Sequence, residues 1–267
     1  MKPGTWTVLR AVGRVTFFEI LRDRILYSIG LVALVLLGIT FIASQLSSLE
    51  TARIVTDVGL SAVSIACSLI GIYSGSTVLN REFERRTAYV ALSRPISRAQ
   101  FVCGKYAGVA LALVLNWALL CVTFFLMILF FAESGVAGLL AQVSSTLGLA
   151  LLFVLLQALV LAALSLAIST YSSTLVSAMV SSGFFLVGIN LSQLRMLAGR
   201  SESGVVRDFI PALTRVLPDF EHFNLGLKVT YDLPIPASFA WASFGYAVCV
   251  TGVALGAAAL LIRTKEN

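Results

Sequence analysis

Residues 80–105 read NREFERRTAYVALSRPISRAQFVCGK, and this charged stretch lies between two long apolar runs. Its charged side chains are Arg81, Glu82, Glu84, Arg85, Arg86, Arg94, Arg98 and Lys105. An unpaired charge in hydrocarbon costs several kcal/mol, so we expect the stretch to lie in water at a membrane surface. Its excess of arginine and lysine indicates the cytoplasmic surface.

The composition of the whole chain points to a membrane protein. Apolar residues make up 58% of the 267 residues and charged residues only 12%, against about 45–50% and about 25% in soluble domains. The net charge of +6 comes from basic residues that border apolar runs, a topology signal and not a nucleic-acid-binding stripe. Four cysteines are scattered without paired spacing, so we expect small buried hydrophobes and neither a metal site nor a disulfide.

Six apolar runs each have close to the roughly 20 residues that a helix needs to cross the hydrocarbon core. They cover residues 26–46, 54–79, 106–131, 147–168, 175–194 and 238–262. A single helix over 147–194 would be about 72 Å long, over twice the core thickness, so the link 169–174 is expected to turn. The predicted fold class is an all-α integral membrane protein with six transmembrane helices, as one domain over residues 1–267.

The flanking segments fix the expected topology. With both termini inside, thirteen of the nineteen basic residues lie on the cytoplasmic side, which favours an even number of spans. Residues 4–24 mix apolar and basic side chains and fit an interfacial helix, although a plain polar leader is the alternative. Residues 195–237 form an outer loop in which Val205, Phe209 and Leu213 recur at helical spacing, which predicts a short amphipathic helix.

The spans lack the chemistry of an enzyme or of an ion-coupled carrier. Their deep parts hold no Asp, Glu, Lys or Arg, whereas intramembrane catalysis and proton coupling both need ionisable groups there. His222, the single histidine, falls in the outer loop. Gly104-Lys105 does not complete a phosphate-binding loop, because position 99 is Ala99 and not glycine. We therefore expect no enzymatic activity and no cofactor in this chain, and a driving force supplied by another polypeptide.

Two spans carry narrow faces of small and hydroxylated residues. Ser61, Ser64 and Ser68 recur in the second span; Ser173, Ser177 and Ser181 recur in the fifth, with Asn190 close by. Such residues either let helices pack closely and hydrogen-bond across the contact or line a path for an amphiphilic substrate. The glycine pairs 71/75, 104/108 and 252/256 fit the small-xxx-small spacing, which predicts packing sites.

The charged stretch resembles the cytoplasmic segment of type-2 ABC exporter permeases. The family pattern is roughly E-x-E-x-G-T, then L-x-x-P-[IV]-S-R, then G-K. This chain has Glu82-Phe-Glu84-Arg-Arg-Thr87, then Leu92-Ser-Arg-Pro95-Ile-Ser-Arg98, then Gly104-Lys105. It departs from the pattern at Arg86, where glycine is common. The chain is also similar to the permease group that includes nitrous-oxide-reductase-maturation and gliding-motility transporters.

This resemblance implies several roles for particular segments. Residues 4–24 would be an N-terminal elbow helix, and residues 80–105 would hold a cytoplasmic coupling helix that docks in a groove of an ATPase. The coupling residues would be Glu82, Glu84, Arg85, Arg86, Thr87 and Pro95. The second and fifth spans would line the pathway, and residues 195–237 would form an outer gate. A solvated loop whose arginines only fix topology is the alternative for 80–105.

The implied assembly is a homodimer, or a pair with a similar permease, bound to two ABC ATPase subunits that hold ATP and Mg²⁺. The expected function is the permease subunit of an exporter of an amphiphilic or lipid-like molecule in the prokaryotic cytoplasmic membrane. In the alternative, the same architecture transports nothing and relays ATPase motion to a periplasmic partner. Replacing Glu82 and Arg85 together is expected to uncouple ATP hydrolysis from transport.

Overall fold

A computed structural model describes residues 5–24, 51–84, 97–131, 145–200, 217–230 and 235–264, with isolated positions 27, 30, 31, 34, 35, 38, 210 and 233. All the secondary structure of the described part is helical, as predicted. Its elements are α1 (Thr5–Leu21), α3 (Thr51–Glu84), α5 (Arg98–Phe131), α7 (Ser145–Ser169), α8 (Thr174–Gly188), α9 (Leu191–Arg200), η1 (Glu221–Phe223), α11 (Gly226–Thr230) and α12 (Ala237–Thr264). The predicted first span, residues 26–46, lies almost entirely outside the described residues.

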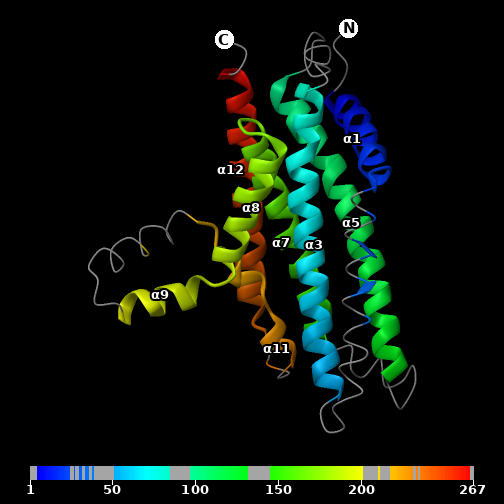
Figure 1. Cartoon of the computed structure of the whole chain (residues 1–267), viewed down its shortest axis with the longest axis vertical. Coiled ribbons are helices and arrows are strands. Elements are labelled where there is room, and N and C mark those ends of the chain that lie inside the picture. Colours follow the sequence, from blue (N-terminus) through cyan, green and yellow to red (C-terminus); the bar gives the residue numbers. More distant parts are fainter. Residues whose placement is uncertain are drawn as a thin grey trace.

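Four long helices, α3, α5, α7 and α12, run along the longest axis of the molecule (Figure 1). Each contains a segment long and apolar enough to cross a membrane: Thr56–Glu82, Arg98–Leu129, Thr146–Ser169 and Ala237–Ile262. These segments confirm that the predicted second, third, fourth and sixth spans are helices of sufficient length. The start of α1, the end of α3, the start of α5 and the end of α12 all lie at the same end of the bundle. We call it the α1 end.

Helix α7 is the centre of the bundle because it is apolar on all sides. It has no charged residue, and it packs against α3, α5, α8 and α12. A helix without a polar face is stable when neighbours cover it all round. Glycines allow the closest of these contacts: a Cβ at Gly71 would lie 2.6 Å from the carbonyl oxygen of Ala158, and one at Gly75 would collide with Ala162.

Of the other two predicted glycine pairs, one lies at a close helix contact and the other does not. Gly104 and Gly108 of α5 meet α1, where a Cβ at Gly13 would lie 3.3 Å from the Gly104 carbonyl oxygen. The packing prediction is thus confirmed for the pairs 71/75 and 104/108. It is wrong for Gly252 and Gly256 within this chain, because nothing described lies within 4 Å of a Cβ placed at either.

The predicted fifth span, residues 175–194, is broken. Helix α7 ends at Ser169 and α8 begins at Thr174, which confirms the turn between them. However, α8 ends at Gly188, and its axis makes an angle of 65° with the following helical segment. The 15 residues of α8 are about 22 Å long, less than the roughly 30 Å of a hydrocarbon core. The prediction of one uninterrupted helix there is wrong, but α8 and the segment Leu191–Gly199 are together long and apolar enough for a single broken span.

Hydrogen bonds from a distant segment explain the break. In a continuous helix the Gly188 carbonyl would accept from the N–H of residue 192. Here the Phe220 N–H donates to that carbonyl at 3.2 Å, and the Ser192 N–H donates to the Glu221 carboxylate at 3.1 Å. Phe220 and Glu221 thus take both partners of one helical bond, and α9 turns aside from the bundle (Figure 1).

Candidate functional site

Charged side chains gather at the α1 end, where α1, α3 and α5 meet. Arg81 of α3 forms a salt bridge with Asp23, which follows α1. The Tyr73 hydroxyl donates to the same carboxylate at 2.9 Å and accepts from Arg81 at 2.9 Å. The two bonds to Asp23 join residues that are 50 and 58 positions apart in the chain, so they hold the end of α1 against α3.

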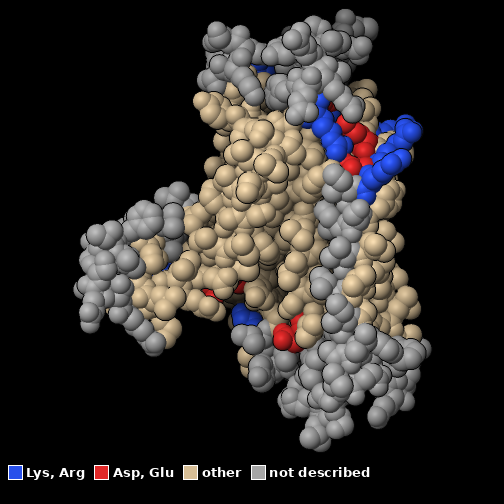
Figure 2. Space-filling view, viewed as in Figure 1, with Lys and Arg blue, Asp and Glu red and all other residues tan. Residues whose placement is uncertain are grey.

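Lys105 lies deeper in the same junction. Its side chain is 2% exposed, and it forms a salt bridge with Glu82 and lies 3.9 Å from the Glu19 carboxylate. A buried ammonium is tolerated only with such partners. Figure 2 shows acidic side chains enclosed by basic ones at this end of the molecule. We call Glu19, Asp23, Arg81, Glu82 and Lys105 the charged junction.

The two ends of the stretch 80–105 belong to long helices, and part of its charge is paired within the chain. Residues up to Glu84 continue α3, and residues from Arg98 onward begin α5. Glu82, expected to face an ATPase, is paired within the chain to Lys105, and Glu84 is the last residue of α3. The remaining predicted coupling residues, Arg85, Arg86, Thr87 and Pro95, lie outside the described residues.

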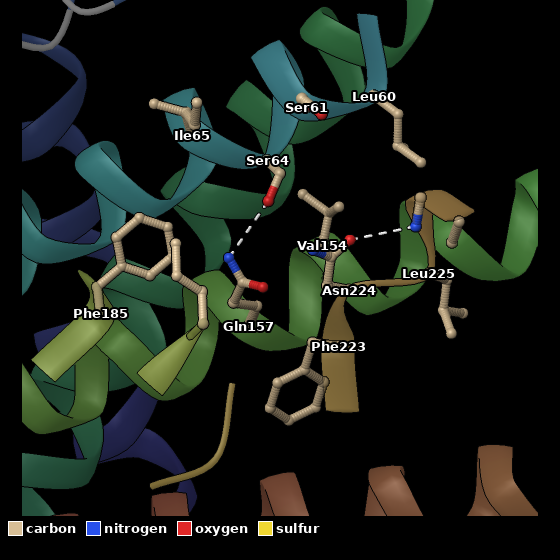
Figure 3. Close-up of a pocket in the computed structure, with 13 residues that line it drawn as sticks. Leu60, Ser61, Ser64, Ile65, Val154, Gln157, Phe185, Phe223, Asn224 and Leu225 are labelled. Carbon is tan, nitrogen blue, oxygen red and sulfur yellow. Dashed lines mark hydrogen bonds between the residues drawn. The ribbon is translucent and has the colours of Figure 1, made fainter. Parts of the chain in front are cut away.

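A pocket of about 160 Å³ lies between α3, α7, the end of α8 and residues 223–226. Its walls are mostly aliphatic and aromatic, with Val154, Phe185 and Phe223 among them (Figure 3). Its polar groups are the hydroxyls of Ser61 and Ser64 and the carboxamides of Gln157 and Asn224. The residues that line it include no Asp, Glu, Lys, Arg or His, so the pocket offers hydrogen bonds without charge.

Gln157 organises the polar side of this pocket. Its Nε2 donates to Ser68 Oγ at 2.8 Å and to Ser64 Oγ at 3.3 Å, the latter drawn in Figure 3. Ser68 Oγ in turn donates to the Ser64 carbonyl at 2.7 Å. This network satisfies a buried amide and fixes the two hydroxyls. On the opposite wall the Asn224 side-chain oxygen accepts from the Gly226 N–H at 3.2 Å.

Of the predicted pathway residues, those of α3 lie at the pocket and those of residues 173–190 do not line it. Ser61 and Ser64 line the pocket, and Ser68 is buried directly beside them. Ser177 is buried and donates to the Ser165 carbonyl of α7 at 2.8 Å. Three others lie away from the pocket lining: Ser173 is exposed before α8, Ser181 is buried within it, and Asn190 follows it.

Sequence reasoning missed Gln157 and the residues 223–226. Gln157 had a usable signal, because it is the only carboxamide in the apolar run 147–168. Residues 223–226 had none, because no local pattern in the sequence indicates that they lie beside α3 and α7. The expectation that the cysteines are buried is confirmed for Cys67 and Cys121. It is wrong for Cys103 and Cys249, which are exposed.

Comparison with known proteins identifies the family of this chain. Residues 11–198 match the family described as "ABC-2 family transporter protein". Among curated proteins, none matches the chain. The matched region begins in α1 and ends in α9, so it includes the charged junction and three of the four segments that bound the pocket. Because this match covers more than half of the sequence, the chain belongs to the ABC-2 family of membrane transporter proteins.

Proposed function

We propose that the chain is the permease subunit of an ATP-driven exporter, and that it moves an amphiphilic or lipid-like molecule outward. The observation that carries this proposal is the pocket. Its apolar walls suit an acyl or aromatic group, and its hydroxyls and carboxamides suit a polar but uncharged head. Ser61 is exposed at the pocket, so a substrate can reach the polar side from the surface of α3.

The energy for this movement would come from two ABC ATPase subunits that bind ATP and Mg²⁺, with a second permease copy completing the pathway. The deep parts of the spans carry no ionisable residue that could couple to an ion gradient. The charged junction supports a mechanical route instead. It joins the ends of α3 and α5 to α1, so a push on the segment between α3 and α5 would move these helices together.

The orientation follows from the same charges. The α1 end would face the cytoplasm of a prokaryotic cell, because most basic residues flank the helix ends gathered there. Residues 217–226 would then face the outer side and cover the pocket. A periplasmic accessory protein could dock on this outer segment.

A relay function is the second candidate, and one observation favours it. The outer segment is bonded directly to the end of α8 and the start of α9, through Phe220 and Glu221. A movement of α8 would therefore be transmitted to the outer surface even if no substrate passed.

The decisive experiment fills the pocket. The chain is purified in mild detergent with the ATPase that accompanies it, reconstituted into vesicles, and tested for ATP-dependent movement of a fluorescent nitrobenzoxadiazole phospholipid between leaflets. Ser61→Trp should abolish this movement while the ATPase still co-purifies. Leu119→Trp, on the exposed side of α5, is the matched control and should retain it.

Three results would overturn the proposal. If no ATPase accompanies the chain, the permease role fails altogether. If Ser61→Trp and its control move the phospholipid equally well, the pocket is not on the route. Should neither protein move any phospholipid while outer-segment accessibility to protease still changes with ATP, the relay function replaces export.

A further inference from the structure

The exposed side of α1 carries an ordered stripe of basic residues. Arg10, Arg14, Phe18 and Arg22 follow one another at intervals of four, and all four are exposed. The Arg22 N–H donates to the Phe18 carbonyl at 3.2 Å, so the helical turn continues to the end of the stripe. The opposite side of α1 is buried, with Gly13 and Thr16 against α5. We call the exposed side the arginine stripe.

The acidic residues of α1 and of the segment after it pair with basic residues outside the arginine stripe. Glu19 points to Lys105, and Asp23 bonds to Arg81. Among the described residues no carboxylate pairs with Arg10, Arg14 or Arg22. Like charges four residues apart on a helix repel one another. A stripe of this kind is stabilised when an anionic surface outside the chain supplies the missing negative charge.

Apolar side chains flank the arginine stripe. Trp6 is 76% exposed and Val15 is 65% exposed, and at 100° per residue they lie next to Arg10 and Arg22 on either side of the stripe. The Arg14 guanidinium lies 5.8 Å from the centre of the Phe18 ring. Arginine, tryptophan and apolar residues together are typical of helices at the headgroup level of a bilayer.

The neighbour of α1 indicates the same environment. Helix α1 packs on the first turns of α5, at Gly104 and Gly108. Further along α5, the side chains of Leu111, Leu119 and Leu126 are exposed, as expected for a face in contact with lipid tails. The arginine stripe therefore lies at the edge of a surface suited to lipid, at the height where headgroups would begin.

We propose that the arginine stripe binds the headgroups of anionic phospholipids. The guanidinium groups of Arg10, Arg14 and Arg22 would pair with lipid phosphates, which arginine can bind through two parallel hydrogen bonds. Trp6 and Val15 would enter the boundary between headgroups and tails. A protein partner is the less suitable occupant, because exposed apolar residues continuous with a lipid-facing helix match a bilayer. This inference concerns α1 alone and does not depend on the direction of transport.

Trp6 provides a direct test because it borders the stripe. In a Trp117→Phe/Trp241→Phe background it is the only tryptophan of the chain. The protein is placed in vesicles of phosphatidylcholine and phosphatidylglycerol in two preparations of identical composition. In one the phosphatidylglycerol carries fluorescence-quenching bromines, and in the other an equal amount of phosphatidylcholine does. Both leaflets contain both lipids, so the orientation of the protein does not matter.

We expect brominated phosphatidylglycerol to quench Trp6 at least about twice as strongly as brominated phosphatidylcholine, since each basic residue near a surface enriches anionic lipid by up to about fivefold. Arg10→Gln/Arg14→Gln/Arg22→Gln should lower this ratio to about one. The matched lysine triple variant should keep it raised, because the charge remains. Arg195→Gln, in α9, should also keep it raised.

Equal quenching by the two lipids in the parent protein would overturn the proposal, as would a raised ratio in the glutamine variant. Absence of quenching by either lipid would place Trp6 in water or beneath a partner protein and would also overturn it. If the glutamine variant does not reconstitute, the parent ratio in rising salt decides. Headgroup binding requires that ratio to fall toward one as the charges are screened.

Discussion

Lys105 shows how one side chain can hold several elements together. It is fully enclosed at the α1 end and forms a salt bridge with Glu82, with Glu19 nearby. The attraction between buried charges depends on both being present. Removal of one partner leaves the other without compensation, and the loss then exceeds the net contribution of the pair.

We predict that Lys105→Met lowers the free energy of unfolding by about 3–5 kcal/mol. Thermal unfolding in detergent, followed by helical circular dichroism, measures this loss. The control is Lys228→Met, whose ammonium lies 3.9 Å from the Phe239 ring centre and should matter by about 0.5–1 kcal/mol. Adding Glu82→Gln to Lys105→Met should restore part of the stability. Equal losses for both lysine variants would show that the junction is not a buried ion pair.

For single residues, the sequence indicated that charged side chains gather between the second and third spans, but it did not indicate which of them form ion pairs with one another. Glu82 was expected to face an ATPase, yet it pairs with Lys105, 23 positions later. Asp23 and Arg81 pair across 58 positions. Local spacing cannot reveal such pairs, because they depend on how α1 packs against α3 and α5. Glycine contacts were more predictable, since the four-residue spacing itself creates the groove.

Helix contacts offer the clearest predictions at the scale of the element. Gly71 lets α3 approach α7 until a Cβ would meet the Ala158 carbonyl oxygen at 2.6 Å. Because that neighbour is backbone, the helices must separate to admit a methyl group. We predict that Gly71→Ala destabilises the protein by about 1–3 kcal/mol. The matched control, Gly252→Ala, adds its methyl group to open space on α12 and should cause no loss in the same melting experiment. A stable Gly71→Ala variant would argue against the α3–α7 contact.

The break between α8 and α9 depends on Glu221. Its carboxylate accepts from both the N–H and the hydroxyl of Ser192. We predict that Glu221→Ala frees the start of α9 and speeds tryptic cleavage after Arg195 by about tenfold. Glu221→Gln keeps an acceptor oxygen and should remain close to the parent. If alanine and glutamine variants are cleaved alike and slowly, another contact holds α9.

The length and position of most helices could be predicted from apolar runs, and the break could not. The turn at 169–174 followed from length alone, because no bilayer accommodates a helix of 48 residues upright. Residues 175–194 read as one continuous span since nothing in that run interrupts a helix. The interruption comes from Phe220 and Glu221, which lie about 30 residues further on and compete for the backbone at Gly188 and Ser192.

The whole molecule is a helical bundle with the charged junction at the α1 end and a pocket between α3, α7 and the end of α8. Four spans and the all-helical fold class were predictable because burial in lipid demands apolar length. The pocket was only half predictable. Two of its serines stand out in α3, but residues 223–226, which also line it, lie more than 50 positions after the end of α7 in the sequence.

The arrangement in Figure 1 makes a final prediction about topology, since the α7–α8 turn and the start of α9 lie at different heights along the bundle. Tyr171 is 79% exposed in that turn, and Gln193 is exposed in α9. In a background without the four native cysteines, each is replaced by cysteine and treated with a membrane-impermeant maleimide. Gln193→Cys should react in intact cells, and Tyr171→Cys only after permeabilisation.

The expected labelling depends on the charges at the helix ends and on the length of α8. The basic residues that flank the helix ends at the α1 end are the basis for expecting the turn at Tyr171 on the cytoplasmic side. Helix α8 covers only about 22 Å before it breaks, so Gln193 reacts from outside only if the region around α9 is open to water. Labelling of Tyr171→Cys in intact cells would invert the orientation. Protection of Gln193→Cys from both sides would instead bury α9 in lipid, and the outer segment would then seal the pocket from water.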